Sequence, residues 1–199
     1  MPFRYSTVSR DGKQILALGE TMRGELNVYD TQAQEFRPYL NGISAGFVEF
    51  SRDRQWVTYV AYPDATLWRS RVDGTERLQL TTPSLGVILN LRWSPDGKFI
   101  VFMSWGSVEI DNRIYLVSAD GGAPMLLLSG DFSPSDPTWS PDGKSIAYGG
   151  SASLGEDIRF TEIRILNLET RRSTIIPGSK GFYGPRWFAR WTLHCCAVE

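Results

Sequence analysis

Histidine and cysteine are scarce in this sequence, with one histidine and two cysteines, and its serines and carboxylates do not stand in a known catalytic motif. A serine nucleophile needs a histidine base that is oriented by a carboxylate, and the only histidine is His194, close to the C-terminus. The sequence has no G-x-S-x-G elbow, no G-x-x-x-x-G-K-S/T phosphate loop and no histidines and carboxylates at zinc spacing. We therefore predict no catalytic residue, no metal site and no cofactor, and we expect that this segment is not an enzyme.

Three aspartates have the residue type, though not the pattern, of calcium ligands. Asp96, Asp120 and Asp142 each precede a glycine. A calcium loop needs several oxygen ligands clustered in one short stretch, and these stretches lack them. Because aspartate also favours tight turns, we interpret all three as turn-forming residues.

Three tryptophans share one position relative to a repeated motif. Trp93 and Trp139 each precede Ser-Pro-Asp-Gly, and Trp187 stands where a further copy is due. Tryptophan can stack against a ligand, but the same register beside every turn is more typical of packing between repeated units. We predict a structural role for these residues and for the turns that follow them: Trp93, Pro95, Asp96, Gly97, Trp139, Pro141, Asp142, Gly143 and Trp187.

The motif belongs to an internal repeat. A Ser-x-Asp anchor followed by an apolar alternation starts at four positions that are 42, 43 and 46 residues apart, namely Ser9, Ser51, Ser94 and Ser140. Apolar runs separated by turn residues indicate four strands in each unit; in the third unit these are residues 88–94, 99–105, 113–119 and 123–129. No segment has a convincing helical pattern. The sequence thus predicts an all-β protein of four-stranded units.

The anchor itself has the composition of a tight turn. Serine at the first position can accept a main-chain N–H, proline at the second fixes φ, and glycine at the fourth tolerates positive φ. The second unit has Arg54 where the other units have glycine. Because a non-glycine residue at positive φ costs about 1–2 kcal/mol, we expect a looser turn there.

The units resemble the TolB-type, WD-like β-propeller repeat over essentially the whole chain up to Trp187. The resemblance rests on "RWSPDGKFIVF" and "TWSPDGKSIAY", and on the later stretches "IYLVSADGG" and "IRILNLET". It implies a partial β-propeller of about four blades plus the first strand of a fifth, with blades stacked radially around a channel. The implied propeller spans residues 1–187, with blades at 3–41, 46–83, 87–130 and 136–178 and a fifth starting at 182–187. We expect a chain truncated at both ends, a fragment of a larger bacterial protein whose missing blades are its partners.

The resemblance also implies where a ligand or partner docks. In such propellers, the loops between one blade and the next crowd around the mouth of the channel, where exposed aromatic side chains are suited to binding. The corresponding loops here are "TPSLGV", "GDFSPSDP" and "GSKGFYGP". The binding residues expected from them are Phe132, Asp136, Phe182 and Tyr183.

Composition narrows the class of function. With 42% hydrophobic residues, a net charge of -1 and a pI near 5.9, the chain is an ordinary globular sequence without the basic excess of a nucleic-acid-binding surface. It has no apolar run long enough to insert into a membrane, and its compartment stays open. We expect a non-catalytic interaction or sensing module that binds a protein partner. The alternative is the substrate-gating propeller of a prolyl-oligopeptidase-type serine peptidase that lacks its catalytic domain.

The repeat fails directly after Trp187, where "FARWTLHCC" replaces the expected Ser-Pro-Asp-Gly and strand. These nine residues can be encoded by the codons TTC GCC CGA TGG ACG CTA CAT TGC TGC. Read one base later, they give Ser-Pro-Asp-Gly-Arg-Tyr-Ile-Ala, the turn and strand that the repeat demands. We therefore interpret residues 188–199 as an aberrant, frameshifted tail, in which His194, Cys195 and Cys196 have no selected role.

Overall fold

The computed structural model describes residues 3–19, 21–106, 112–130, 133–150, 161–187 and 192–197. These residues form short β-strands throughout, and their only helical elements are two 3-10 turns, η1 (Leu40–Gly42) and η2 (Pro83–Leu85). In this part of the chain no helix has the length and apolarity to span a membrane. The predicted all-β fold class is confirmed.

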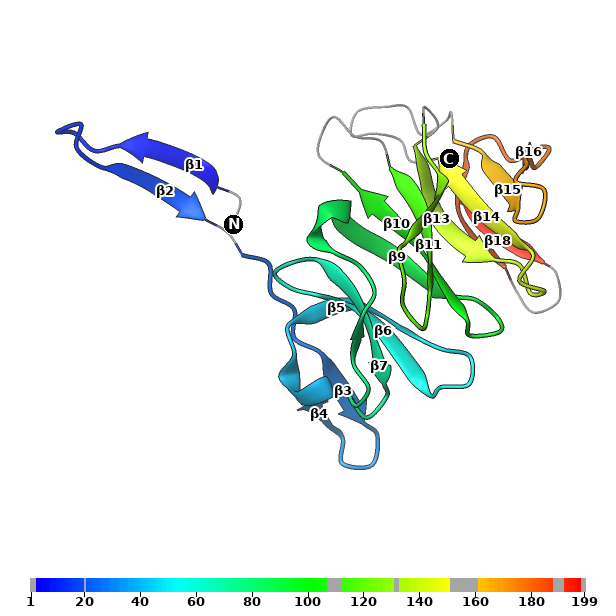
Figure 1. Ribbon diagram of the computed structural model, residues 1–199, viewed down its shortest axis with the longest axis horizontal. Coiled ribbons are helices and arrows are strands. Elements are labelled where there is room, and N and C mark those ends of the chain that lie inside the picture. Colours follow the sequence, from blue (N-terminus) through cyan, green and yellow to red (C-terminus); the bar gives the residue numbers. More distant parts are fainter. Residues whose placement is uncertain are drawn as a thin grey trace.

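The second, third and fourth units each form a four-stranded antiparallel sheet whose strands follow one another in chain order (Figure 1). The second blade contains β5 (Ala45–Phe50), β6 (Trp56–Ala61), β7 (Thr66–Arg71) and β8 (Leu78–Gln79). The third contains β9 (Val87–Trp93), β10 (Phe99–Trp105), β11 (Arg113–Ser118) and β12 (Met125–Leu128). The fourth contains β13 (Pro134–Trp139), β14 (Ser145–Gly150), β15 (Ile163–Asn167) and β16 (Ser173–Ile175). These are propeller blades, each too small to cover its own faces.

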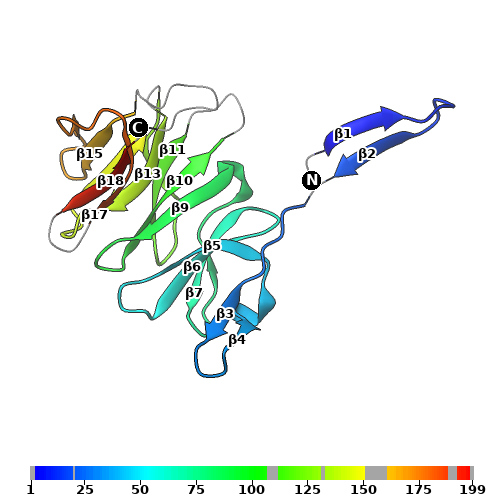
Figure 2. The same ribbon diagram turned by 180° about the vertical axis from the view of Figure 1, so that it is seen from behind.

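The first unit is divided into two separate hairpins, although the sequence predicts one blade over residues 3–41. β1 (Phe3–Val8) pairs only with β2 (Ile15–Gly19), and β3 (Asn27–Asp30) pairs with β4 (Glu35–Pro38). Figures 1 and 2 show the β1–β2 hairpin projecting away from the rest of the molecule.

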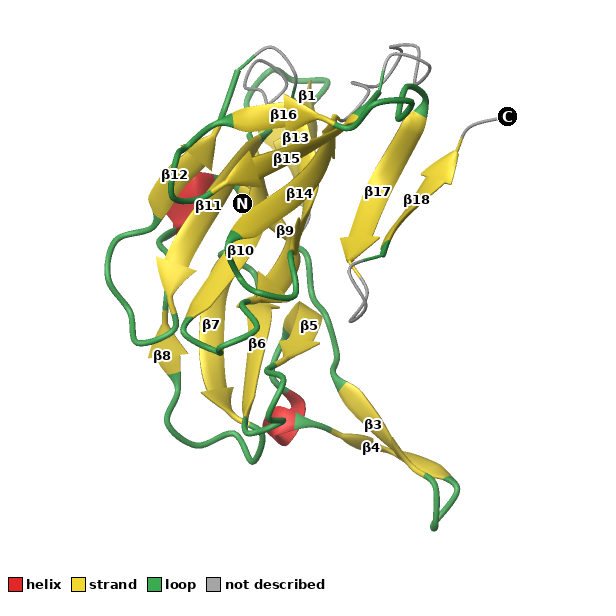
Figure 3. Cartoon of the chain, turned by 90° about the vertical axis from the view of Figure 1, so that its right-hand side faces the viewer, coloured by secondary structure: helices red, strands yellow, loops and turns green. Residues whose placement is uncertain are grey.

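The fifth unit is a hairpin rather than the single strand expected. β17 (Phe182–Trp187) pairs with β18 (Leu193–Ala197), which belongs to the aberrant tail. Figure 3 shows β3–β4 and β17–β18 as two-stranded ribbons that are not continuous with the four-stranded sheets.

The core lies between the facing sides of neighbouring blades. One cluster joins the second blade to the third through residues such as Leu67 and Phe102, and another joins the third to the fourth through residues such as Ile114 and Ile146. In β10 every residue from position 100 to 104 is buried, on both faces of the sheet. A blade covered on both faces therefore shows a continuous apolar run instead of the alternation of a half-exposed strand.

The anchor turns form as their composition predicts. In the third blade the Ser94 hydroxyl accepts the Phe99 N–H at 2.9 Å and donates to the Asp96 carboxylate at 2.6 Å. The fourth blade repeats both contacts at Ser140, again at 2.9 and 2.6 Å. These hydrogen bonds close the hairpin between the first two strands of each blade.

The turn at Arg54 is not looser than the others, contrary to the expectation from its sequence. Arg54 adopts φ 58°, close to the 73° of Gly97, and its N–H donates to the Ser51 carbonyl at 2.9 Å. The turn thus keeps its geometry because the surrounding sheet holds Arg54 in a strained conformation.

Replacing Arg54 with glycine should raise the free energy of unfolding by about 0.5–1 kcal/mol. Glycine removes a strain of about 1–2 kcal/mol but gives back part of it by loosening the unfolded chain. Urea unfolding measures the difference, with Gly97→Arg as the matched control, which should lower stability by about 0.5–1 kcal/mol because the same two effects act with opposite signs. Equal stability of Arg54→Gly and the parent chain would show that this turn carries no strain.

Candidate functional site

The first strands of successive blades form the inner wall of the propeller. β9 packs beside β5, β13 beside β9, and β17 beside β13. Because each blade extends outward from its first strand, these four strands line one side of the central axis (Figure 2). Their side chains form the surface that a ligand in the channel would touch.

Each of these four strands contains a bulge three residues before its aromatic anchor. The pairing with the second strand shifts register there, and one residue adopts positive φ: Phe47 at 51°, Asn90 at 52°, Asp136 at 52° and Gly184 at 59°. A β-bulge bends the strand and redirects the side chains near it. Three of the four residue types tolerate this conformation well, whereas Phe47 does not.

Ion pairs link neighbouring strands along the wall. Arg92 on β9 lies 3.7 Å from the Glu49 carboxylate on β5, and Arg186 on β17 lies 3.1 Å from the Asp136 carboxylate on β13. Burial raises the pKa of Glu49, and the nearby Arg92 and Arg186 guanidinium groups oppose that rise. The wall therefore presents alternating charges, one of them a partly desolvated carboxylate.

The tryptophan anchors cross from one blade to the preceding one. The Trp93 indole donates to the Glu49 carbonyl at 3.2 Å, and the Trp139 indole donates to the Arg92 carbonyl at 3.1 Å. Both side chains are only 8% exposed. This geometry agrees with inter-blade packing, although the structural role of these residues stays a prediction until it is measured.

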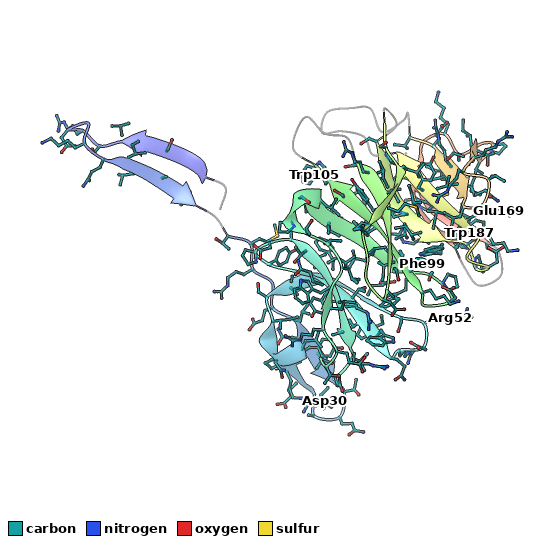
Figure 4. All side chains as sticks on the ribbon, in the orientation of Figure 1. Asp30, Arg52, Phe99, Trp105, Glu169 and Trp187 are labelled. Carbon is teal, nitrogen blue, oxygen red and sulfur yellow. The ribbon has the colours of Figure 1, made fainter. Side chains whose placement is uncertain are left out.

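A cavity of about 560 Å³ opens between the anchor turns at one end of the wall. Its lining combines charged residues, among them Glu49, Arg52 and Arg92, with the indoles of Trp139 and Trp187. Figure 4 shows Arg52 at the tip of the β5–β6 hairpin and Trp187 on the side of the fourth blade. Within the described part of the chain, Arg52 makes no ion pair. This cavity is the strongest candidate binding site.

The structure places the predicted binding residues differently from the sequence expectation. Phe132 lies outside the described residues. Asp136 lies on β13 and pairs with Arg186, and Phe182 and Tyr183 lie on β17, so none of these three is in a loop. Tyr183 is 42% exposed and Phe182 is partly buried.

Sequence reasoning missed the charged residues of the wall. Glu49, Arg92 and Arg186 each stand directly before the aromatic anchor of their blade. From the second unit to the fifth, that position holds an acidic residue, a basic residue, Thr138 and a second basic residue. That signal was available in the repeat, but the ion pairs depend on the neighbouring blade.

No group of three or more histidine, cysteine, aspartate or glutamate side chains that could hold a metal ion occurs among the residues that the structure describes. The carboxylates of Asp96 and Asp142 accept hydrogen bonds within their own turns, whereas the Asp120 carboxylate lies 3.5 Å from the Arg69 guanidinium of the second blade. The hydrogen bond from the Ser140 hydroxyl is the main cause that holds the pKa of the Asp142 carboxyl below its ordinary value of 3.8. The hydrogen bond from the Lys144 N–H lowers this pKa further.

The turn aspartates make stability sensitive to acid. Asp96 and Asp142 have a folded pKa below the ordinary value of 3.8. Their contribution to the free energy of unfolding is therefore present above the unfolded pKa and is lost as pH falls through the folded pKa. Asp142→Asn should therefore lower the melting temperature by more at pH 7 than at pH 3. Thermal melts of both chains at the two pH values test this, and an equal difference at both would contradict it.

Comparison with known proteins supports the fold more than any activity. No family model matches the chain. It is 39% identical over 67 residues to the uncharacterised peptidase YuxL of Bacillus subtilis, covering 34% of this chain and 10% of that protein. It is 30% identical over 115 residues to the uncharacterised protein Atu1656 of Agrobacterium fabrum, covering 50% of this chain and 38% of that protein.

Solved structures share the arrangement of blades. The TolB structure from Agrobacterium tumefaciens matches with a TM-score of 0.66 at 19% identity, over 89% of this chain and 63% of that one. The chain has a TolB-like β-propeller fold. The nidogen/laminin complex structure matches this TolB-like propeller with a TM-score of 0.65 at 13% identity, over 87% of this chain and 64% of that one.

Some structures that share the TolB-like propeller fold are enzymes. Oligogalacturonate lyase from Vibrio parahaemolyticus matches with a TM-score of 0.59 at 15% identity, over 84% of this chain and 49% of that one. Fold alone therefore does not separate binding from catalysis. The chain spans less than two thirds of each of these proteins.

Proposed function

We propose that the chain is a non-catalytic propeller module that binds a protein segment at its inner wall. The observation that carries this proposal is the cavity between the anchor turns, whose lining joins indole surface to charged groups. Aromatic and arginine side chains are the types that dominate protein–protein binding energy. Arg52 is exposed at the rim, so we expect the bound segment to carry a carboxylate.

Two arginine variants provide a matched comparison. Arg52→Glu reverses a charge on the cavity, and Arg113→Glu reverses a charge on β11, outside the cavity lining. Both side chains are exposed, so neither variant should unfold the chain. A displayed library of random twelve-residue peptides serves as the probe, selected against the immobilised parent chain.

The selected peptides should be enriched in Asp or Glu. They should bind the parent chain and Arg113→Glu alike, and bind Arg52→Glu at least about tenfold more weakly, because the reversed charge would repel the carboxylate of the peptide. Peptides that bind all three chains equally, or a selection that yields no binding peptide, would overturn it.

A second candidate function has one specific observation in its favour. The 39% identity over 67 residues to the peptidase YuxL is consistent with a substrate-gating propeller of a serine peptidase. The sequence of the neighbouring DNA separates the two functions. A downstream α/β-hydrolase segment favours the peptidase, whereas an upstream kinase or winged-helix segment favours the binding module.

A further inference from the structure

The β1–β2 hairpin exposes a position that is buried in the three complete blades. Leu16 follows its anchor residue by eight positions, as Thr58, Val101 and Ala147 follow theirs. Leu16 is 59% exposed, whereas these three equivalents are 0% exposed, and Val101 packs against the following blade. The hairpin therefore carries the apolar pattern of an interior blade strand without a surface that covers it.

The inner wall shows a matching gap next to β5. Trp93 and Trp139 each pack on the preceding first strand and are 8% exposed, but Phe50, the anchor of the second blade, is 49% exposed. The strand that should cover Phe50 is the first strand of the first blade, β1. Its absence from this position explains the exposed ring.

The outer half of the first blade is already in its place. The Gly24 N–H donates to the Ser44 hydroxyl at 3.2 Å, just before β5. The third blade makes the equivalent contact to the fourth, where the Asn112 N–H donates to the Ser133 hydroxyl at 3.3 Å. β3–β4 is anchored as in a complete blade but forms a sheet of two strands instead of four, so the first blade lacks its two inner strands beside β3.

We propose that the β1–β2 hairpin docks into this gap of its own chain and forms a four-stranded first blade in the order β1-β2-β3-β4. Docking covers Leu16, which then faces the second blade, covers Phe50, and pairs the open edge of β3 with β2. The arrangement in Figure 1 is then the open form of a blade that closes about the connection after Gly19.

The register of the closed blade follows from the fourth blade. Asp30 and Asn167 occupy the same position, since the side-chain oxygen of each accepts the main-chain N–H groups two and three residues later. In the fourth blade the residue before Asn167 pairs with Ile146, which is the equivalent of Ile15. Ile15 therefore lies opposite Tyr29 in the closed blade.

The length of the connection favours docking within one chain. Seven residues join β2 to β3, and the same number joins β10 to β11 in the complete third blade. A connection this short gives the tethered hairpin an effective concentration on the order of millimolar. A hairpin from a second copy, present at micromolar concentration, cannot compete with that.

A paired-cysteine experiment tests both the docking and the register. In a full-length chain that carries C195S and C196S, Leu16→Cys and Val28→Cys introduce thiols at the pair next to Ile15 and Tyr29. Opposed residues of antiparallel strands have Cα atoms about 4.5–5.5 Å apart, within the range of a disulfide. The control combines Leu16→Cys with Arg37→Cys, one strand further out and about 10 Å away.

Mild oxidation should convert most of the Leu16→Cys/Val28→Cys chain to an intramolecular disulfide, at least about tenfold more than the control. A disulfide-linked dimer would overturn docking within one chain and show exchange of hairpins between copies. A lack of cross-linking, or equal cross-linking in the control, would overturn the docking itself.

Hydrogen exchange on the unmodified chain gives a second readout that does not depend on the cysteine variants. In the closed blade β2 is bonded on both edges, so its amide exchange should slow at least about tenfold relative to a hairpin bonded on one edge. Exchange from residues 15–19 at the rate of exposed peptide would overturn the proposal.

Discussion

Replacing Trp139 with alanine is expected to lower the free energy of unfolding by about 3–5 kcal/mol, the usual cost of truncating a buried tryptophan. The indole packs in one cluster with Ile146 and Leu166, and its N–H donates to the Arg92 carbonyl across the blade boundary at 3.1 Å. For a chain of this size the loss corresponds to a melting temperature lower by about 6–20 °C. Urea unfolding and thermal melts measure both quantities.

Trp105→Ala is the matched control for this prediction. Trp105 ends β10, the second strand of the third blade, as a 48% exposed side chain (Figure 4), so its removal should change stability by no more than about 0.5 kcal/mol. Similar small effects of both variants would contradict the packing role of Trp139. Unchanged stability with lost peptide binding would instead support a ligand-stacking role.

Recoding the tail should produce the second large effect. Four hairpins pair each anchor residue with the residue seven positions later: Val8 with Ile15, Phe50 with Val57, Trp93 with Ile100, and Trp139 with Ile146. Trp187 pairs with Leu193, only six positions later. We propose that residues 188–195 are the fifth anchor turn and strand in the wrong reading frame, because the frame one base later puts isoleucine seven positions after Trp187.

A chain in which Ser-Pro-Asp-Gly-Arg-Tyr-Ile-Ala replaces residues 188–195 should be about 2–4 kcal/mol more stable. The turn gains hydrogen bonds worth about 1 kcal/mol each, and an apolar strand residue adds about 1.5–3 kcal/mol if it is fully buried. Cys196→Ser, at an exposed residue of the same tail, is the control and should change little. Sequencing the gene decides the origin: codons from Phe188 that do not yield Ser-Pro-Asp-Gly one base later rule out the frameshift.

Strand positions and turns could be predicted from the sequence because they depend on neighbouring residues. The predicted strand over residues 99–105 is β10 (Phe99–Trp105), and the hydrogen bonds of Ser94 and Ser140 follow from the residue types of each turn. The strain at Arg54 was the local exception. A turn with one unfavourable residue keeps its shape when the sheet on either side determines it.

The wall of the candidate site could not be predicted in the same way. Arg186 and Asp136 are 50 positions apart in the chain, so their ion pair exists only once two blades stand side by side. Asp136 itself looked like a loop residue because it stands among Ser and Pro. The bulge that places it on β13 arises from pairing with β14.

The sequence by itself determined the repeat, the four-stranded unit and the turn that closes each inner hairpin, since local propensities and side-chain hydrogen bonds act within a few residues. Only the tertiary structure decided which charges meet on the inner wall, that the anchor indoles donate to the preceding blade, and that β1–β2 stands away from β3–β4. Each of these depends on the packing of one blade against the next, and a repeat read one unit at a time contains no information about that contact.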